Sequence, residues 1–75
     1  MERQQGIWKV GRVDGVDRRK GIAFIRPQGE GVRVFAHFSD IASDDDRLCE
    51  GDAVRFFVVQ DGRGWRAREI RRLRS

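Results

Sequence analysis

Short apolar runs separated by glycine-containing turns make up most of this chain. Val, Ile and Phe gather in runs that are bounded, about every ten residues, by glycines such as Gly21, Gly31, Gly51 and Gly62. Short strands with turn signals at this spacing are typical of an all-β barrel or sandwich. Neither an internal repeat nor a low-complexity linker divides the 75 residues, so we expect a single domain over residues 1–75.

The pattern predicts five strands, over residues 7–16, 21–27, 32–38, 53–59 and 65–70, the last of which ends at Ile70 or Leu73. Gly11 and Gly15 lie inside the first strand and indicate a bulge or a sharp bend. Pro27 has no amide hydrogen and therefore ends the second strand. In the fourth strand, alternate positions are apolar and are expected to face the core: Val54, Phe56 and Val58.

The connection between the third and fourth strands carries a helix signal. Ser43 followed by Asp44, Asp45 and Asp46 is typical of a helix N-cap with acidic residues in the first turn. We therefore expect one short helical turn there.

Charge is distributed unevenly along the chain. Sixteen Lys and Arg against twelve Asp and Glu give a net charge of +4. Residues 1–37 carry eight basic and four acidic side chains, residues 38–62 two basic and seven acidic, and residues 63–75 six arginines and one glutamate. A polyanion responds to a local basic patch more than to the net charge. Both ends of the chain are therefore candidates for contact with a polyanion, and a solvated charged surface is the alternative.

Residues that support catalysis or metal binding are sparse. His37 is the only histidine, and no second titratable group stands at a recognisable spacing from it. Cys49 is the only cysteine, which excludes an internal disulfide and a multi-cysteine zinc site. The run Asp44–Asp46 lacks the alternating spacing of a calcium loop. We therefore expect no enzymatic activity, no metal and no cofactor.

Membrane and export signals are also missing from the pattern. No apolar run approaches the roughly 20 residues that cross a bilayer. Residues 1–6 are not followed by the apolar stretch of a signal peptide. We expect a soluble, cytoplasmic protein that does not contact a membrane.

Aromatic and basic residues are interleaved on the second and third predicted strands. If Ala23 and Ala36 face the core, the neighbouring positions face outward: Ile22, Phe24, Phe35 and His37, with Phe38 at the strand end and Lys20 and Arg26 beside them. Exposed rings are costly unless something stacks on them. Unpaired nucleobases stack on such rings while arginines hold the phosphates. The alternative is that these rings belong to the core or to a protein interface.

Three short motifs resemble a known family. Residues 20–25, KGIAFI, are similar to the K-G-F-G-F-I motif of cold-shock domains, and residues 34–39, VFAHFS, are similar to their V-F-V-H-F-S motif. Residues 50–56, EGDAVRF, are similar to the later E-G-Q-x-V-x-F. The resemblance covers residues 11–70, with residues 1–6 and 71–75 as flanking tails.

The resemblance implies a five-stranded antiparallel OB-type barrel that binds single-stranded RNA or DNA, often as an RNA chaperone or a transcription antiterminator. We expect RNA to be bound in preference to DNA. The contact residues implied by the motifs are Lys20, Phe24, Phe35, His37 and Phe38. Strand alternation and charge add three more candidates, Ile22, Arg26 and Arg66.

Some positions depart from the family pattern. Gly15 and Val16 stand where the family usually has Trp-Phe, and Ile22 replaces the first Phe of its motif. At roughly 1–3 kcal/mol per stacked base, these losses predict weaker, more salt-sensitive and less base-selective binding. They also favour an alternative function, a protein-interaction module that contacts a partner through the Asp44–Asp46 loop or an outward Phe57.

Overall fold

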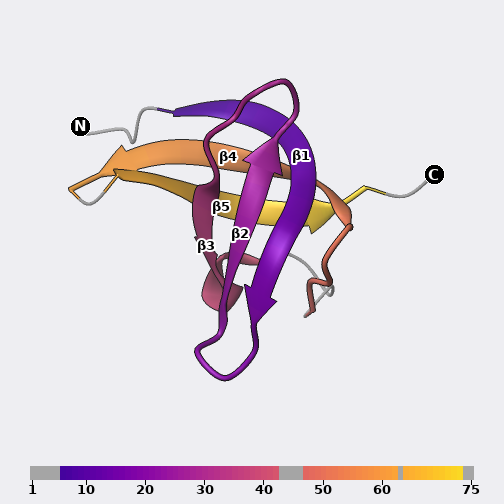
Figure 1. The fold of residues 1–75 in the computed structure, drawn as a ribbon. Helices are drawn as coiled ribbons and strands as arrows, with labels where there is room; N and C mark the ends of the chain where they lie inside the picture. Colours follow the sequence, from indigo (N-terminus) through magenta and orange to yellow (C-terminus); the bar gives the residue numbers. More distant parts are fainter. Residues whose placement is uncertain (1–5, 43–46, 63, 74–75) are drawn as a thin grey trace.

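The strands close into a barrel in the order β1-β2-β3-β5-β4 (Figure 1). This computed structural model describes residues 6–42, 47–62 and 64–73. The elements are β1 (Gly6–Asp17), β2 (Ile22–Pro27), β3 (Val34–His37), the 3-10 turn η1 (Phe38–Asp40), β4 (Ala53–Asp61) and β5 (Gly64–Arg72). Neighbouring strands pair antiparallel, except that β3 and β5 run parallel where the barrel closes. The expected all-β, five-stranded barrel is confirmed, and the short helical turn that the structure describes is η1.

β1 contributes to two sides of the barrel. Its first half pairs with β4 and its second half pairs with β2. Gly11 permits the close approach of β2, because a Cβ there would meet the backbone carbonyl oxygen of Arg26 and lie 2.9 Å from the Cα of Pro27. The register with β2 shifts between Val13 and Gly15, so the irregularity expected in this strand is present.

Side chains alternate between the core and the outer surface, as the sequence pattern predicts. Ala23 and Ala36 lie opposite each other on β2 and β3 and are fully buried. Phe56 and Leu48 supply large buried side chains on the other side of the core. The buried apolar cluster comprises Val13, Ala23, Ile25, Val34, Ala36, Leu48, Val54, Phe56, Val58, Ala67 and Ile70. Because the core takes every second position of β2 and β3, the positions between them face outward.

The structure differs from the predicted elements around β3. This strand begins at Val34 rather than at Val32, because a turn containing Gly29 at a positive φ of 78° precedes it. It ends at His37, and η1 begins at Phe38. The helical turn expected at Ser43–Asp46 lies outside the described residues.

β4 and β5 form a longer hairpin than predicted, because β4 reaches Asp61 and β5 runs from Gly64 to Arg72. Their register shifts once, and Glu69 in the shifted stretch of β5 has a positive φ of 55°. Such a bulge bends a strand, and β5 pairs with β3 on one side and with β4 on the other. Among the described residues, no helix is long and apolar enough to span a membrane.

Candidate nucleic-acid interface

Two phenylalanine rings lie side by side on the outside of β2 and β3. The register places Phe24 opposite Phe35 and Ile22 opposite His37. The ring centroids of the two phenylalanines are 6.1 Å apart, and the ring planes are inclined by 67°, an edge-on arrangement that aromatic pairs favour. The two rings and Ile22 are half-buried, and His37 is exposed. These four side chains are called the aromatic face below.

Guanidinium groups border the aromatic face beside Phe24. The guanidinium carbon of Arg33 lies 5.0 Å from the centre of the Phe24 ring, which is a cation–π contact. Arg26 pairs with the Asp14 carboxylate at 3.1 Å and donates to the Gly31 carbonyl oxygen at 3.1 Å. Arg33 lies 3.7 Å from the same carboxylate. Asp14 therefore holds two cations close to one ring of the face.

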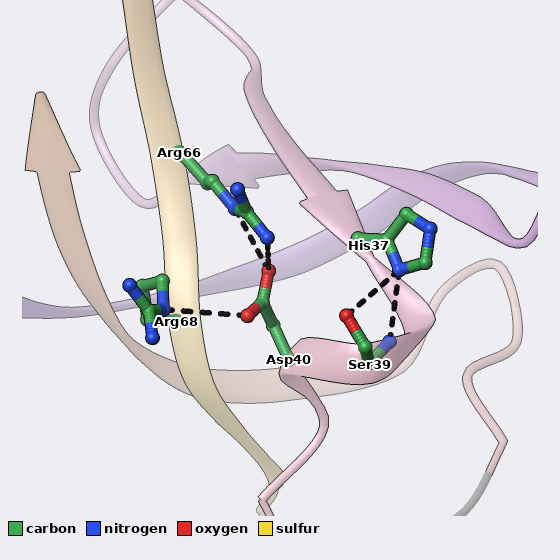
Figure 2. Close-up of polar contacts among 5 residues, drawn as sticks. All are labelled: His37, Ser39, Asp40, Arg66 and Arg68. Carbon is green, nitrogen blue, oxygen red and sulfur yellow. Dashed lines mark hydrogen bonds and ion pairs between the residues drawn. The ribbon is translucent and has the colours of Figure 1, made fainter. Parts of the chain in front are cut away.

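A buried carboxylate holds two more arginines on the other side. Arg66 donates from Nε to Oδ2 of Asp40 at 3.0 Å, and Arg68 Nε lies 3.3 Å from Oδ1 (Figure 2). The Asp40 side chain is only 8% exposed, so its charge needs these partners. Arg66 also stands opposite Phe35 in the parallel register of β3 and β5. The Asp40 contact therefore fixes a guanidinium at the edge of the aromatic face.

The imidazole of His37 is oriented by its own cap. Its Nδ1 accepts a hydrogen bond from the backbone N–H of Ser39 at 3.1 Å and lies 2.9 Å from the Ser39 hydroxyl oxygen (Figure 2). In the neutral ring the proton is therefore on Nε2. Because His37 is exposed, that N–H is available as a donor to a ligand on the aromatic face.

Two expected contact residues lie at the margins. Lys20 is exposed in the turn between β1 and β2. Phe38, expected at the exposed end of the third strand, instead begins η1, is half-buried and packs against the core cluster. Because Phe35 and His37 face outward, the alternation itself turns the next side chain inward. Less of this ring is available to a ligand than the sequence predicts.

Gly15 leaves an open place in the aromatic face. It lies opposite Phe24 in the register of β1 and β2. A Cβ built on Gly15 would meet nothing within 4 Å. Phe57, considered as a protein contact, is half-buried on the outside of β4, where its ring lies 5.2 Å from that of Trp8. The Asp44–Asp46 segment, considered for the same role, lies outside the described residues.

Asp40 and Arg33 are the site residues that sequence reasoning missed. Arg33 was predictable as one of many cations but not as the partner of Phe24. Asp40 and Arg66 are 26 residues apart, and only the closure of the barrel brings them together. Within the described ranges, no group of three His, Cys, Asp or Glu side chains is arranged to hold a metal ion.

Two solved structures with the same fold share about a fifth of their residues with this chain. The "drosophila Unr CSD456" structure has a TM-score of 0.77 and 22% identity, covering 91% of this chain and 27% of that one. The structure of apo-CusF from Escherichia coli has a TM-score of 0.69 and 20% identity, covering 96% of this chain and 92% of that one. At these identities the likeness shows the fold alone.

Comparison of the sequence with known proteins shows the family as well as the fold. Cold shock protein CspA of Staphylococcus aureus is 42% identical over 66 residues, which is 87% of this chain and 98% of the relative. Cold shock protein ScoF of Streptomyces coelicolor is 41% identical over 61 residues, 80% of this chain and 91% of the relative. Cold shock protein 1 of Arabidopsis thaliana is 38% identical over 64 residues, and the match spans only 21% of that protein. The profile of the "'Cold-shock' DNA-binding domain" matches residues 9–73. The chain belongs to the cold-shock DNA-binding domain family.

Proposed function

We propose that this protein binds single-stranded nucleic acid on its aromatic face, without catalysing a reaction. The observation that carries the proposal is the pair of outward rings, Phe24 and Phe35, with guanidinium groups fixed on both sides. Membership of the cold-shock DNA-binding domain family supports nucleic-acid binding. Flat rings flanked by cations fit a chain of flat bases joined by phosphates.

Each side chain has a distinct part in this proposal. One base stacks on Phe35, and a second stacks on Phe24 or on the Arg33 guanidinium that lies over it. His37 donates from Nε2 to a base or a phosphate, and Ile22 adds apolar contact beside it. Three cations are assigned to phosphates: Lys20, Arg26 and Arg66. Phe38 contributes the part of its ring that the core leaves uncovered.

The size of the aromatic face sets the expected affinity. Stacking contributes roughly 1–3 kcal/mol per base, and Gly15 and Ile22 contribute no ring. Phosphate contacts by arginine then supply a large share of the free energy, and this share falls as salt rises. We therefore propose binding that is weak, strongly salt-dependent and tolerant of base sequence.

The biological role follows from a preference for unpaired bases. A protein that binds the single strand and not the duplex shifts the equilibrium between them by mass action. Such a protein melts RNA secondary structure without ATP, as an RNA chaperone or a transcription antiterminator does. We propose RNA as the main ligand, because folded RNA presents unpaired loops whose splayed bases stack on aromatic side chains.

Phe35→Ala tests the proposal. Losing one stacked base lowers the affinity for a labelled single strand by about 5- to 150-fold, by the stacking range of roughly 1–3 kcal/mol. The barrel should stay folded, because the ring lies on the outer surface of β3. Val32→Ala is the control, since Val32 is exposed and lies off the aromatic face. Equal affinities for the wild type and the Phe35 variant, in a salt titration with RNA and DNA of one sequence, would refute the assignment.

The alternative is a protein-interaction barrel with weakened nucleic-acid binding. The observation that favours it is the glycine at position 15, which leaves the place opposite Phe24 without an aromatic ring. A pull-down with nuclease treatment separates the two functions. A protein partner that stays bound after nuclease supports the alternative, and loss of the captured material on nuclease treatment supports nucleic-acid binding.

A further inference from the structure

A second cluster of rings and cations lies on the outside of β1 and β4. Trp8 is 48% exposed, and its ring lies 5.2 Å from that of Phe57 at an interplanar angle of 60°. The guanidinium carbon of Arg55 lies 4.4 Å from the centre of the Trp8 ring. The register places Trp8 opposite Phe57 and Val10 opposite Arg55. These four side chains are called the Trp8 face.

The Trp8 face looks away from the aromatic face. In the closed strand order, β4 is separated from β2 by β1 and from β3 by β5. Figure 1 shows β2 and β3 running across β4 and β5 on the barrel. The outer surfaces of the two strand pairs therefore point in different directions, and one base cannot contact both.

Two arginines face each other at the edge of the Trp8 face. Arg55 lies directly opposite Arg71, and both are exposed. Within the described part of the chain, neither guanidinium forms an ion pair with a carboxylate. Like charges directly opposite each other on neighbouring strands destabilise a sheet. An anion placed between them removes that cost, so the pair is suited to a phosphate.

A shallow depression adjoins the indole. It has a volume of about 350 Å³, and it is lined by Trp8, Val10 and Arg55, by Pro27 and Gln28 at and just after the end of β2, and by Lys9 and Glu30. The Glu30 carboxylate is paired with the Lys9 ammonium group, so the charge of this acid is balanced within the depression. This volume is within the range of small-molecule sites. A flat group seated there would lie against the Arg55 guanidinium, which itself lies over the Trp8 ring. An apolar protein surface would instead leave the two facing arginines buried without anions.

We propose that the Trp8 face binds a second segment of single-stranded nucleic acid, so that one barrel holds two segments at once. The proposal rests on the proposed function of the aromatic face. Two unpaired segments on one small barrel have a high effective concentration relative to each other. The protein would then bring two unpaired, complementary strands together and promote their pairing, in addition to binding single strands.

Titration of the 15N-labelled protein with a six-nucleotide single strand, followed by NMR, tests this site. Amide shifts are expected on β2 and β3 first, and at higher concentration around Trp8 and Arg55, with two strands bound per barrel. Trp8→Ala removes the second set of shifts and keeps the first, whereas Phe35→Ala does the reverse. Arg55→Gln leaves both rings in place and should weaken the second site by about fivefold or more, which covers the case in which Trp8→Ala does not fold.

One control variant and three contrary outcomes complete this test. Trp65→Ala removes the other half-exposed tryptophan, which lies opposite Gln60 and away from the Arg55–Arg71 pair, and should leave both sites unchanged. Shifts confined to β2 and β3, with one strand bound, overturn the second site and leave the proposed function standing. Shifts on neither face overturn both. Concentration-dependent self-association that Trp8→Ala abolishes, without shifts on adding the strand, makes the Trp8 face a protein contact and overturns the proposal.

Discussion

Gly15→Trp should turn this protein into a tighter binder of single strands. Gly15 lies opposite Phe24, and antiparallel partners have Cβ atoms about 4.5–5.5 Å apart. A new indole would therefore stand beside an existing ring of the aromatic face. A Cβ at this position meets nothing within 4 Å, so the backbone need not move to admit a side chain.

The expected gain comes from one additional stacked base. Stacking contributes roughly 1–3 kcal/mol per base, which corresponds to an affinity increase of about 5- to 150-fold. Stability should not fall, because glycine inside a strand costs about 0.5–1 kcal/mol relative to alanine and aromatic residues favour strands. The gain should persist at high salt, since stacking releases no counterions.

Fluorescence anisotropy with a labelled single strand, at two salt concentrations, measures this gain. Gly15→Leu is the matched control, because it adds apolar area without an aromatic ring. The Gly15→Trp variant should bind more tightly than Gly15→Leu at both salt concentrations, with unchanged thermal unfolding.

Equal affinity of the Gly15→Trp variant and the wild type would refute the reasoning. The same titration on Phe35→Ala then locates the error. If Phe35→Ala weakens binding, the bases do not reach the β1 side of the face. If Phe35→Ala has no effect either, the aromatic face is not where bases stack.

Three further predictions concern stability in urea unfolding. Asp40→Asn should lower the free energy of unfolding by about 1–3 kcal/mol, because two guanidinium groups lose a buried carboxylate; an unchanged midpoint would contradict this role. Gly11→Ala should cost about 1–3 kcal/mol, because the added methyl group meets the backbone of β2, whereas Gly15→Ala, in open space, should cost nothing. Glu69→Gly should raise the free energy of unfolding by up to about 1 kcal/mol, because a positive φ is strained for glutamate and free for glycine, and a loss of stability would count against strain at this bulge.

The outward rings and the inward core were predictable because both depend on local alternation. Ala23 and Ala36 stand next to Phe24 and Phe35 on their strands, so placing the alanines in the core assigns the opposite direction to the two rings. Gly11 and Gly15 marked the irregular strand for the same reason, since a residue without a side chain inside a strand indicates a close approach or a bulge.

Contacts between distant strands were not predictable. The Asp40–Arg66 pair needs the parallel closure of β3 on β5, and the pairing of Trp8 with Phe57 needs the register of β1 on β4. The spacing of apolar residues along the chain predicts neither of these two strand registers. The end of β3 at His37 depends on turn geometry beyond the strand itself. The inward direction of Phe38 was predictable, because it follows from the alternation that turns Phe35 and His37 outward.

The parallel pairing of β3 with β5 determines where the barrel is expected to open locally. Two residue pairs, Phe35 with Arg66 and Ala36 with Ala67, join these strands, and one isolated bridge beyond β3 adds Ile41 with Ile70. Parallel pairs are slightly weaker per residue than antiparallel ones. This seam is therefore where we expect the native state to open first. A nucleic-acid strand that stacks on Phe35 and contacts Arg66 would bridge the two strands. Bound nucleic acid should therefore reduce this local opening and slow hydrogen exchange at Ala36 and Ala67.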